Sequence, residues 1–347
     1  MSNKEYYYEI DMIKLLCAFI VVSIHTTLFM DINPQLYYIY GNYVTRFAVP
    51  FFFISSGFFF TPLLSNSAEP KAIRSNIKRY FLRLLRPFVL WGVCYFILSV
   101  LEDVVIEHNA VKTVLWEKFH LLLVESPGGG LWYVYAVLWI TALLFVFYKH
   151  KREIPFFIIS FVLFLIPSIW NPSSGGLTFM QPVYDAYYKV FLSERNCIFY
   201  AAYFFTGIIL YNYLKRKIAV WKLLLIQAAL YLAFVLLCNI EKNVFVNLLQ
   251  QMNKYFIATG WFLIALHISN KCIRQGWLRD NARKMSTIVY FTHFMSIYLV
   301  KIVLKIIGLK FDNCCSLAFV FCTIILIVYS VVFIKLDKKK KAIRLLY

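Results

Sequence analysis

Three ionisable residues lie along the first apolar stretch of the chain, where charged groups are rare. Lys14 and His25 are eleven residues apart, so a helix places them within about 20° of one face, and Asp11 lies on nearly the same stripe. Eleven residues rise about 16 Å, which puts His25 near the middle of a bilayer when Lys14 is at its inner surface. An ionisable group at that depth favours function over a neutral histidine hydrogen-bonded across a helix interface.

A second candidate site is a basic segment before the third apolar run. Arg79, Arg83 and Arg86 are spaced by four and three residues, so they share one helical face. Guanidinium groups arranged in this way can hold phosphate through paired, charge-assisted hydrogen bonds. The alternative is that these residues mark the inner loop and meet anionic lipid headgroups. Pro87 follows directly, and we expect a spanning helix to start there.

Composition identifies the environment in which these residues work. Of 347 residues, 61% are hydrophobic and 15% are charged, whereas about a quarter are charged in a soluble domain. The net charge of +19 would suggest nucleic acid in a soluble protein, but in a membrane protein it is read as orientation. The sequence therefore predicts a membrane protein that binds no nucleic acid.

The apolar runs predict an all-α polytopic fold with about ten transmembrane helices. The expected spans are 13–30, 47–64, 88–105, 131–148, 155–170, 196–214, 221–240, 255–269, 286–307 and 316–334. Lys and Arg concentrate in alternate segments, which places both termini in the cytoplasm. Acidic residues before the first run argue against a cleavable signal peptide. We expect one domain over residues 1–347, ending in a basic cytoplasmic tail at 335–347.

Other reactive residue types carry less information. The cysteines lack metal spacing and mostly lie in apolar spans, so neither a metal site nor a disulfide is assigned. Glycine-rich phosphate loops and hydrolase motifs are missing from the sequence. The remaining histidines, His108, His120, His150 and His267, and the outer acids, Glu102, Asp103, Asp185 and Glu194, are expected to be structural or to form a solvated rim.

Several of these residues resemble motifs of acyltransferase family 3, integral membrane acyltransferases that modify cell-envelope glycans. The Lys14-x10-His25 spacing, with Asp11 ahead of it, is similar to the family's first-helix signature, and Arg83-Leu-Leu-Arg86 is similar to its Arg-x-x-Arg element. Segments resembling weaker family motifs are Phe51–Phe58, Leu131–Tyr133, Phe204–Gly207 and Val289–His293. The sequence departs in having Lys14 where the family more often has Arg, and in having no attached esterase-like domain.

The resemblance implies transfer of an acyl group from cytoplasmic acyl-coenzyme A to a hydroxyl of a glycan or its lipid-linked precursor, in a bacterial plasma membrane. His25 would take the hydroxyl proton, while Arg83, Arg86, Arg79 and Lys14 would hold the donor's phosphates. Ser56 and Tyr133 are candidate donors to the developing oxyanion. His293, expected to be shallow in the ninth span, and Asp11 are candidate supporting residues, and a covalent acyl-imidazole stays an alternative.

A different function class also has to be considered. The chain is similar to the membrane domain of vancomycin-resistance serine racemases, particularly over Phe47–Phe53, and such a domain would transport a small polar substrate such as an amino acid. His25 would then relay protons. The outer tyrosines could stack on a sugar acceptor or form an interfacial belt. Whether the protein acts as a monomer or a homo-oligomer is left open by the sequence.

Overall fold

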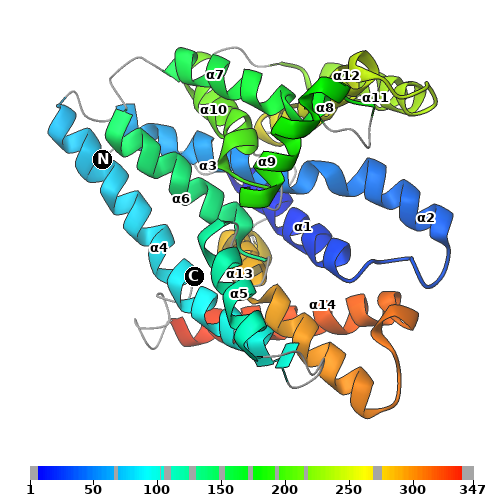
Figure 1. The fold of residues 1–347 in the computed structure, drawn as a ribbon. Coiled ribbons are helices and arrows are strands. Elements are labelled where there is room, and N and C mark those ends of the chain that lie inside the picture. Colours follow the sequence, from blue (N-terminus) through cyan, green and yellow to red (C-terminus); the bar gives the residue numbers. More distant parts are fainter. Residues whose placement is uncertain are drawn as a thin grey trace. The chain divides into compact units, whose positions relative to one another are not determined.

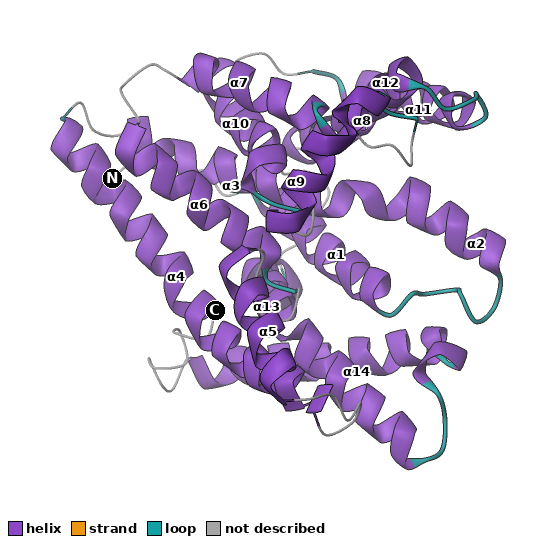
Figure 2. Cartoon of the chain, viewed as in Figure 1, coloured by secondary structure: helices purple, strands orange, loops and turns teal. Residues whose placement is uncertain are grey.

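The structure is a computed structural model that describes residues 7–65, 69–101, 103–104, 111–124, 130–147, 153–170, 175–191, 195–214, 218–268 and 276–337. In these residues every regular element is helical, and Figure 2 shows no strand among them. The predicted all-α fold is therefore confirmed for the described part of the chain.

The long helices coincide with the apolar runs of the sequence (Figure 1). In chain order they are α1 (Tyr8–His25), α2 (Pro34–Ile39), α3 (Ala48–Ser65), α4 (Pro70–Leu101), α5 (Val111–Val124), α6 (Trp132–Phe147), α7 (Glu153–Leu165), α8 (Pro167–Trp170), α9 (Gln181–Phe191), α10 (Cys197–Tyr213), α11 (Val220–Cys238), α12 (Val244–His267), α13 (Trp277–Ile306) and α14 (Cys315–Asp337). Each of the ten predicted spans overlaps one of these helices, except that the fifth overlaps both α7 and α8.

Six stretches of the described chain are long and apolar enough to cross a membrane. They are Pro34–Leu64, Pro70–Leu101, Glu153–Trp170, Val220–Cys238, Trp277–Ile306 and Cys315–Asp337. The helices Trp132–Phe147 and Cys197–Tyr213 are apolar but shorter. The chain therefore has the character of a multi-pass membrane protein, while the count of ten spans and the location of the termini stay predictions. Of the predicted basic tail, residues 338–347 lie outside the described residues.

The chain divides into two compact units. The first comprises Met1–Phe52, Lys217–Gln227 and Gly260–Tyr347, and the second comprises Phe53–Arg216 and Ala228–Thr259. The first unit holds Lys14, His25 and His293, and the second holds the basic segment of α4 together with Ser56 and Tyr133. Each unit therefore carries its own group of candidate site residues.

In the first unit, α1 packs against α13 and α14. The Arg279 guanidinium lies 3.9 Å from the ring centre of Tyr8 near the beginning of α1, and His25 at its end lies beside His293, so α1 and α13 run parallel. The Thr27 hydroxyl, just after the end of α1, donates to Cys315 Sγ at 3.0 Å. Because Cys315 is the first residue of α14, this helix begins where α1 ends and runs antiparallel to it. Two spans that run parallel have an odd number of spans between them, and seven lie between the predicted first and ninth spans.

Helix α13 begins nine residues earlier than the predicted ninth span. Its first turns carry Arg279, Arg283 and Lys284 among apolar residues, and this amphipathic pattern continues the helix beyond the apolar run. His293 consequently lies near the middle of a 30-residue helix and is only 1% exposed. The expectation that His293 lies at a shallow depth in the bilayer stays a prediction, since burial among helices does not fix membrane depth.

In the second unit, α10 packs against α6 and α7, and α4 packs against α6 and α5. The backbone of α10 also lies directly against α3 at two glycines. A Cβ atom on Gly57 would overlap the carbonyl oxygen of Phe204, and one on Gly207 would overlap the carbonyl oxygen of Ile54. Small residues permit such close backbone approach between helices. Ser56 precedes Gly57 and therefore lies at this crossing.

Helix α4 passes through Pro87 without interruption, so the expected helix start at this residue is wrong. Proline keeps a helical φ but removes the N–H that would bond to the carbonyl of Arg83. Pro87 and Phe88 are both buried, and this packing offsets the lost hydrogen bond. The basic segment and the apolar segment therefore form one rod of 32 residues.

Candidate active site

The His25 ring ends α1 and is half-buried among rings from α13. Its centroid lies 4.6 Å from the ring of Phe294 in an edge-on arrangement and 5.4 Å from the ring of His293. The apolar sequence of α1 makes this helix, and the parallel packing of α13 brings the second histidine to its end. Two imidazole groups separated by 268 positions in sequence therefore share one aromatic cluster.

The second histidine of this cluster has a defined hydrogen-bonding state. His293 Nδ1 lies 2.6 Å from the carbonyl oxygen of Tyr290, one turn earlier in α13. A carbonyl can only accept, so Nδ1 carries the proton and Nε2 of the neutral ring carries a lone pair. Nε2 is buried and has no hydrogen-bond partner among the described residues. An unsatisfied buried acceptor costs about 1–3 kcal/mol, so this atom is a place where an incoming donor would bind favourably.

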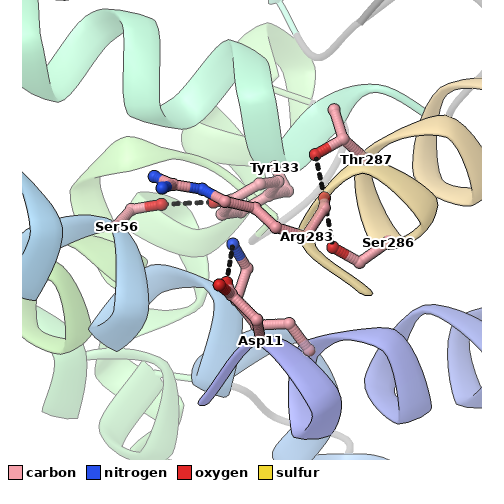
Figure 3. Close-up of polar contacts among 7 residues, drawn as sticks. Asp11, Ser56, Tyr133, Arg283, Ser286 and Thr287 are labelled. Atoms are coloured by element: carbon pink, nitrogen blue, oxygen red, sulfur yellow. Dashed lines mark hydrogen bonds and ion pairs between the residues drawn. The ribbon is translucent and has the colours of Figure 1, made fainter. Parts of the chain in front are cut away.

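Asp11 and Lys14 form an ion pair near the beginning of α1, as Figure 3 shows. Lys14 Nζ lies 3.9 Å from Asp11 Oδ1, and both side chains are largely buried, at 17% and 16% exposed. Arg283 of α13 also acts electrostatically on Asp11. The prediction that Asp11, Lys14 and His25 lie on one helix is thus confirmed. The ion pair lies near one end of α1 and the imidazole at the other.

Ser56 and Tyr133 form the second polar contact drawn in Figure 3. Their hydroxyl oxygens are 2.5 Å apart, joining α3 to α6 within the second unit. The Tyr133 ring packs edge-on against Phe53 at 4.8 Å, one turn before Ser56. In this pair one hydroxyl donates and the other accepts. The sequence predicted both residues as candidate donors but not that they contact each other.

Arg79, Arg83 and Arg86 line one cleft of about 330 Å³ in the second unit. The other lining residues are Leu63, Asn76, Tyr80 and Leu82. All three arginines are exposed, and no carboxylate of the described residues lies within 4.0 Å of them. The guanidinium of Arg83 lies 5.1 Å from the ring centre of Tyr80. The predicted shared face is confirmed, and its cationic groups are available to an anionic ligand.

The remaining candidates fall into ordinary roles where the structure describes them. Asp103 forms an ion pair with Lys118 at 2.7 Å, Asp185 accepts from Gln181 at 2.8 Å, and His267 Nδ1 lies 2.8 Å from the Leu263 carbonyl. Glu102, His108, His150 and Glu194 lie outside the described residues. The outer tyrosines include a cluster, in which Tyr184 and Tyr188 stand 4.5 Å apart and Tyr187 packs on Trp170 at 4.9 Å.

Sequence reasoning missed the residues that support these groups. Phe294 contacts both histidine rings, and Tyr290 supplies the carbonyl that orients His293. Tyr80 and Asn76 complete the arginine cleft, where Asn76 also donates to the Leu63 carbonyl at 3.0 Å. Each lies one to three residues from a predicted site residue on the same helix, and Tyr290 also lies within the motif segment Val289–His293.

Comparison with known proteins identifies the family of this chain. The acyltransferase family 3 model, described as an acyltransferase domain, matches residues 7–334. Two amino-acid racemases of Enterococcus faecalis are 24% and 26% identical over 212 and 218 residues, which is 59% and 60% of this chain. The match covers only 28% and 30% of those relatives, so the chain spans less than a third of their length. No solved structure shows a significant match. Since the family model covers nearly the whole chain, this protein belongs to acyltransferase family 3.

Proposed function

We propose that this protein is a membrane O-acyltransferase that moves an acyl group, acetyl in the simplest case, from cytoplasmic acyl-coenzyme A to a hydroxyl of a cell-envelope glycan or its lipid-linked precursor. Family membership supports acyl transfer, and the long apolar helices support a membrane location. The donor, the acceptor and the bacterial plasma membrane as its location are parts of this proposal.

The observation that carries the choice of donor is the arginine cleft. Coenzyme A ends in a diphosphate and a ribose phosphate, and Arg79, Arg83 and Arg86 offer guanidinium groups to such oxygens from one wall. The density of Lys and Arg in this part of α4 supports a location on the cytoplasmic side, where coenzyme A thioesters are made. Lys14 would add a cation to phosphate binding.

His25 would supply the chemistry of transfer. As the acceptor oxygen attacks the thioester carbonyl carbon, His25 takes the hydroxyl proton, and the carbon–sulfur bond then breaks. The electron pair leaves with sulfur, which receives the proton from His25. Ser56 and Tyr133 provide an O–H for the oxyanion of the tetrahedral intermediate, and Asp11 holds Lys14 in place.

The test of this function uses the purified protein in lipid nanodiscs with acetyl-coenzyme A labelled in the acetyl group. Release of free coenzyme A, together with label in glycan extracted from added envelope membranes, is the expected result. His25→Gln should lose both while keeping the folded protein's melting temperature. Normal transfer by a folded His25→Gln protein would contradict the assignment of His25.

Transport of a small amino acid is a second candidate, favoured by the similarity to amino-acid racemases. Proteoliposomes loaded with buffer and supplied with labelled serine distinguish the two functions. Acyl transfer predicts consumption of acetyl-coenzyme A without serine accumulation. Serine uptake with no loss of acetyl-coenzyme A would replace the enzyme proposal by the transporter.

A further inference from the structure

The His293 side chain offers a hydrogen-bond acceptor that no other described residue uses. Its Nδ1–H donates to the Tyr290 carbonyl at 2.6 Å, which fixes the tautomer and leaves the lone pair on Nε2. Nε2 is buried with no partner among the described residues, and the whole residue is 1% exposed. The ring is therefore held in one orientation with its accepting edge unoccupied.

The His25 ring lies beside the ring that carries this acceptor and can donate through a ring N–H. Its ring centroid lies 5.4 Å from that of His293, and the planes are inclined by 34°. Phe294 packs edge-on against both rings, with centroid distances of 4.6 Å to His25 and 4.7 Å to His293. This shared contact limits the movement of the two histidine rings away from each other. Two imidazole rings joined by one N–H···N hydrogen bond of about 2.9 Å have their centroids about 5 Å apart, which is close to the separation of this pair.

We infer that His293 is a positioning residue for His25: its Nε2 accepts a hydrogen bond from the His25 ring when His25 takes the acceptor's proton. The inference rests on the proposed function. The transferred proton binds one nitrogen of His25, and the N–H already on the other nitrogen donates to His293. No proton moves onto His293, and the proton held by His25 passes to the departing sulfur.

This arrangement would favour the transition state over the resting state. In the resting pair the accepting atom of His293 has no partner among the described residues, whereas a charged His25 would donate a charge-assisted hydrogen bond to it. Interactions that become stronger as charge develops accelerate a reaction, and those present throughout do not. The carboxylate of a Ser-His-Asp triad orients its histidine in a comparable way, and here the acceptor would be a neutral imidazole.

The kinetic test compares three variants in nanodiscs, using acetyl-coenzyme A as the probe and release of free coenzyme A to water as the readout. His293→Leu should lower kcat about 100-fold with KM for acetyl-coenzyme A nearly unchanged, because the donor does not touch this residue. His293→Gln, whose amide oxygen can accept, should recover most of that loss. His267→Leu is the matched control, since His267 also lies near a carbonyl of its own helix but away from His25. In a His25→Gln background, His293→Leu should cause no further loss.

Equal effects of His293→Leu and His267→Leu would overturn the inference, as would independent, multiplying effects of the His25 and His293 substitutions. A second measurement does not depend on turnover. Nitrogen-15 histidine spectra at acidic pH should show an exchange-protected His25 N–H that persists in His293→Gln and disappears in His293→Leu. Its absence from the unsubstituted protein refutes the hydrogen bond, whereas a protein that never consumes acetyl-coenzyme A refutes the proposed function instead.

Discussion

Asp31 and Ser316 join the turn between α1 and α2 to the start of α14. Asp31 Oδ1 accepts the Ser316 hydroxyl at 2.6 Å, and Oδ2 accepts the Ser316 backbone N–H at 3.0 Å. Ser316 is the second residue of α14, where backbone N–H groups have no partner within the helix. The carboxylate of Asp31, 285 positions away in sequence, thus caps α14 in place of a neighbouring side chain.

This contact predicts a loss of stability in acid. Desolvation opposes the shift, but the hydrogen bonds from the Ser316 hydroxyl and N–H together hold the pKa of Asp31 below its ordinary value. A lowered folded-state pKa means that the stabilisation is complete above the unfolded pKa of about 4 and is lost as pH falls through the folded value. Asp31→Asn should melt on the order of 2 °C lower at pH 7, since the site is exposed, and the difference should vanish near pH 2.

The melting temperatures can be followed by intrinsic fluorescence in detergent. Asp312→Asn, at an exposed acid near the same helix end, serves as the control and should leave the pH dependence unchanged. A gap between Asp31→Asn and the unsubstituted protein that stays constant from pH 7 to pH 2 would show that the Asp31 charge has no part in it.

The crossing of α3 and α10 predicts intolerance of a single methyl group. Gly57→Ala or Gly207→Ala should destabilise the protein by about 1–3 kcal/mol, because the added Cβ meets backbone atoms that have no rotamer to adopt. Gly41→Ala is the control, since nothing lies within 4 Å of a Cβ built there. Denaturation in mixed micelles measures the differences. Equal stability of all three variants would mean that the two helices separate without cost.

The arginine cleft predicts weaker donor binding when its charge is removed. Arg83→Gln and Arg86→Gln should each raise KM for acetyl-coenzyme A about 10-fold with a smaller change in kcat, and Arg83→Lys should recover only part, because lysine lacks the paired donors. Arg74→Gln, at an exposed arginine of α4 outside the cleft, should be neutral. Competition by free coenzyme A should weaken in parallel. An unchanged inhibition constant in the Arg83 and Arg86 variants would assign these residues to lipid headgroups instead.

The Ser56–Tyr133 pair predicts coupled effects on the chemical step. Ser56→Ala and Tyr133→Phe should each lower kcat about 10- to 100-fold, and the double variant should be little worse, because the two hydroxyls act as one donor unit. Tyr135→Phe on the same helix should retain activity. If the two effects multiply, the hydroxyls act separately. If only KM changes, they bind substrate without stabilising the oxyanion.

Sequence reasoning located helices well and their ends poorly. The runs of apolar residues predicted every long helix, because a segment that cannot hydrogen-bond to lipid must satisfy its own backbone. It failed at Pro87 and at the beginning of α13, where a buried proline and an amphipathic segment continue the helix beyond the apolar run. Both errors come from packing, which compensates for a lost backbone hydrogen bond or covers one face of a polar helix.

For the site, sequence alone determined relationships within one helix. The spacing of Asp11, Lys14 and His25, and that of Arg79, Arg83 and Arg86, follows from helical geometry. The pairing of His25 with His293 and of Ser56 with Tyr133 depends on which helices pack together and in what direction, and residue spacing carries no information about that. Only the tertiary structure could therefore show that His293 is buried beside His25 with an unoccupied acceptor.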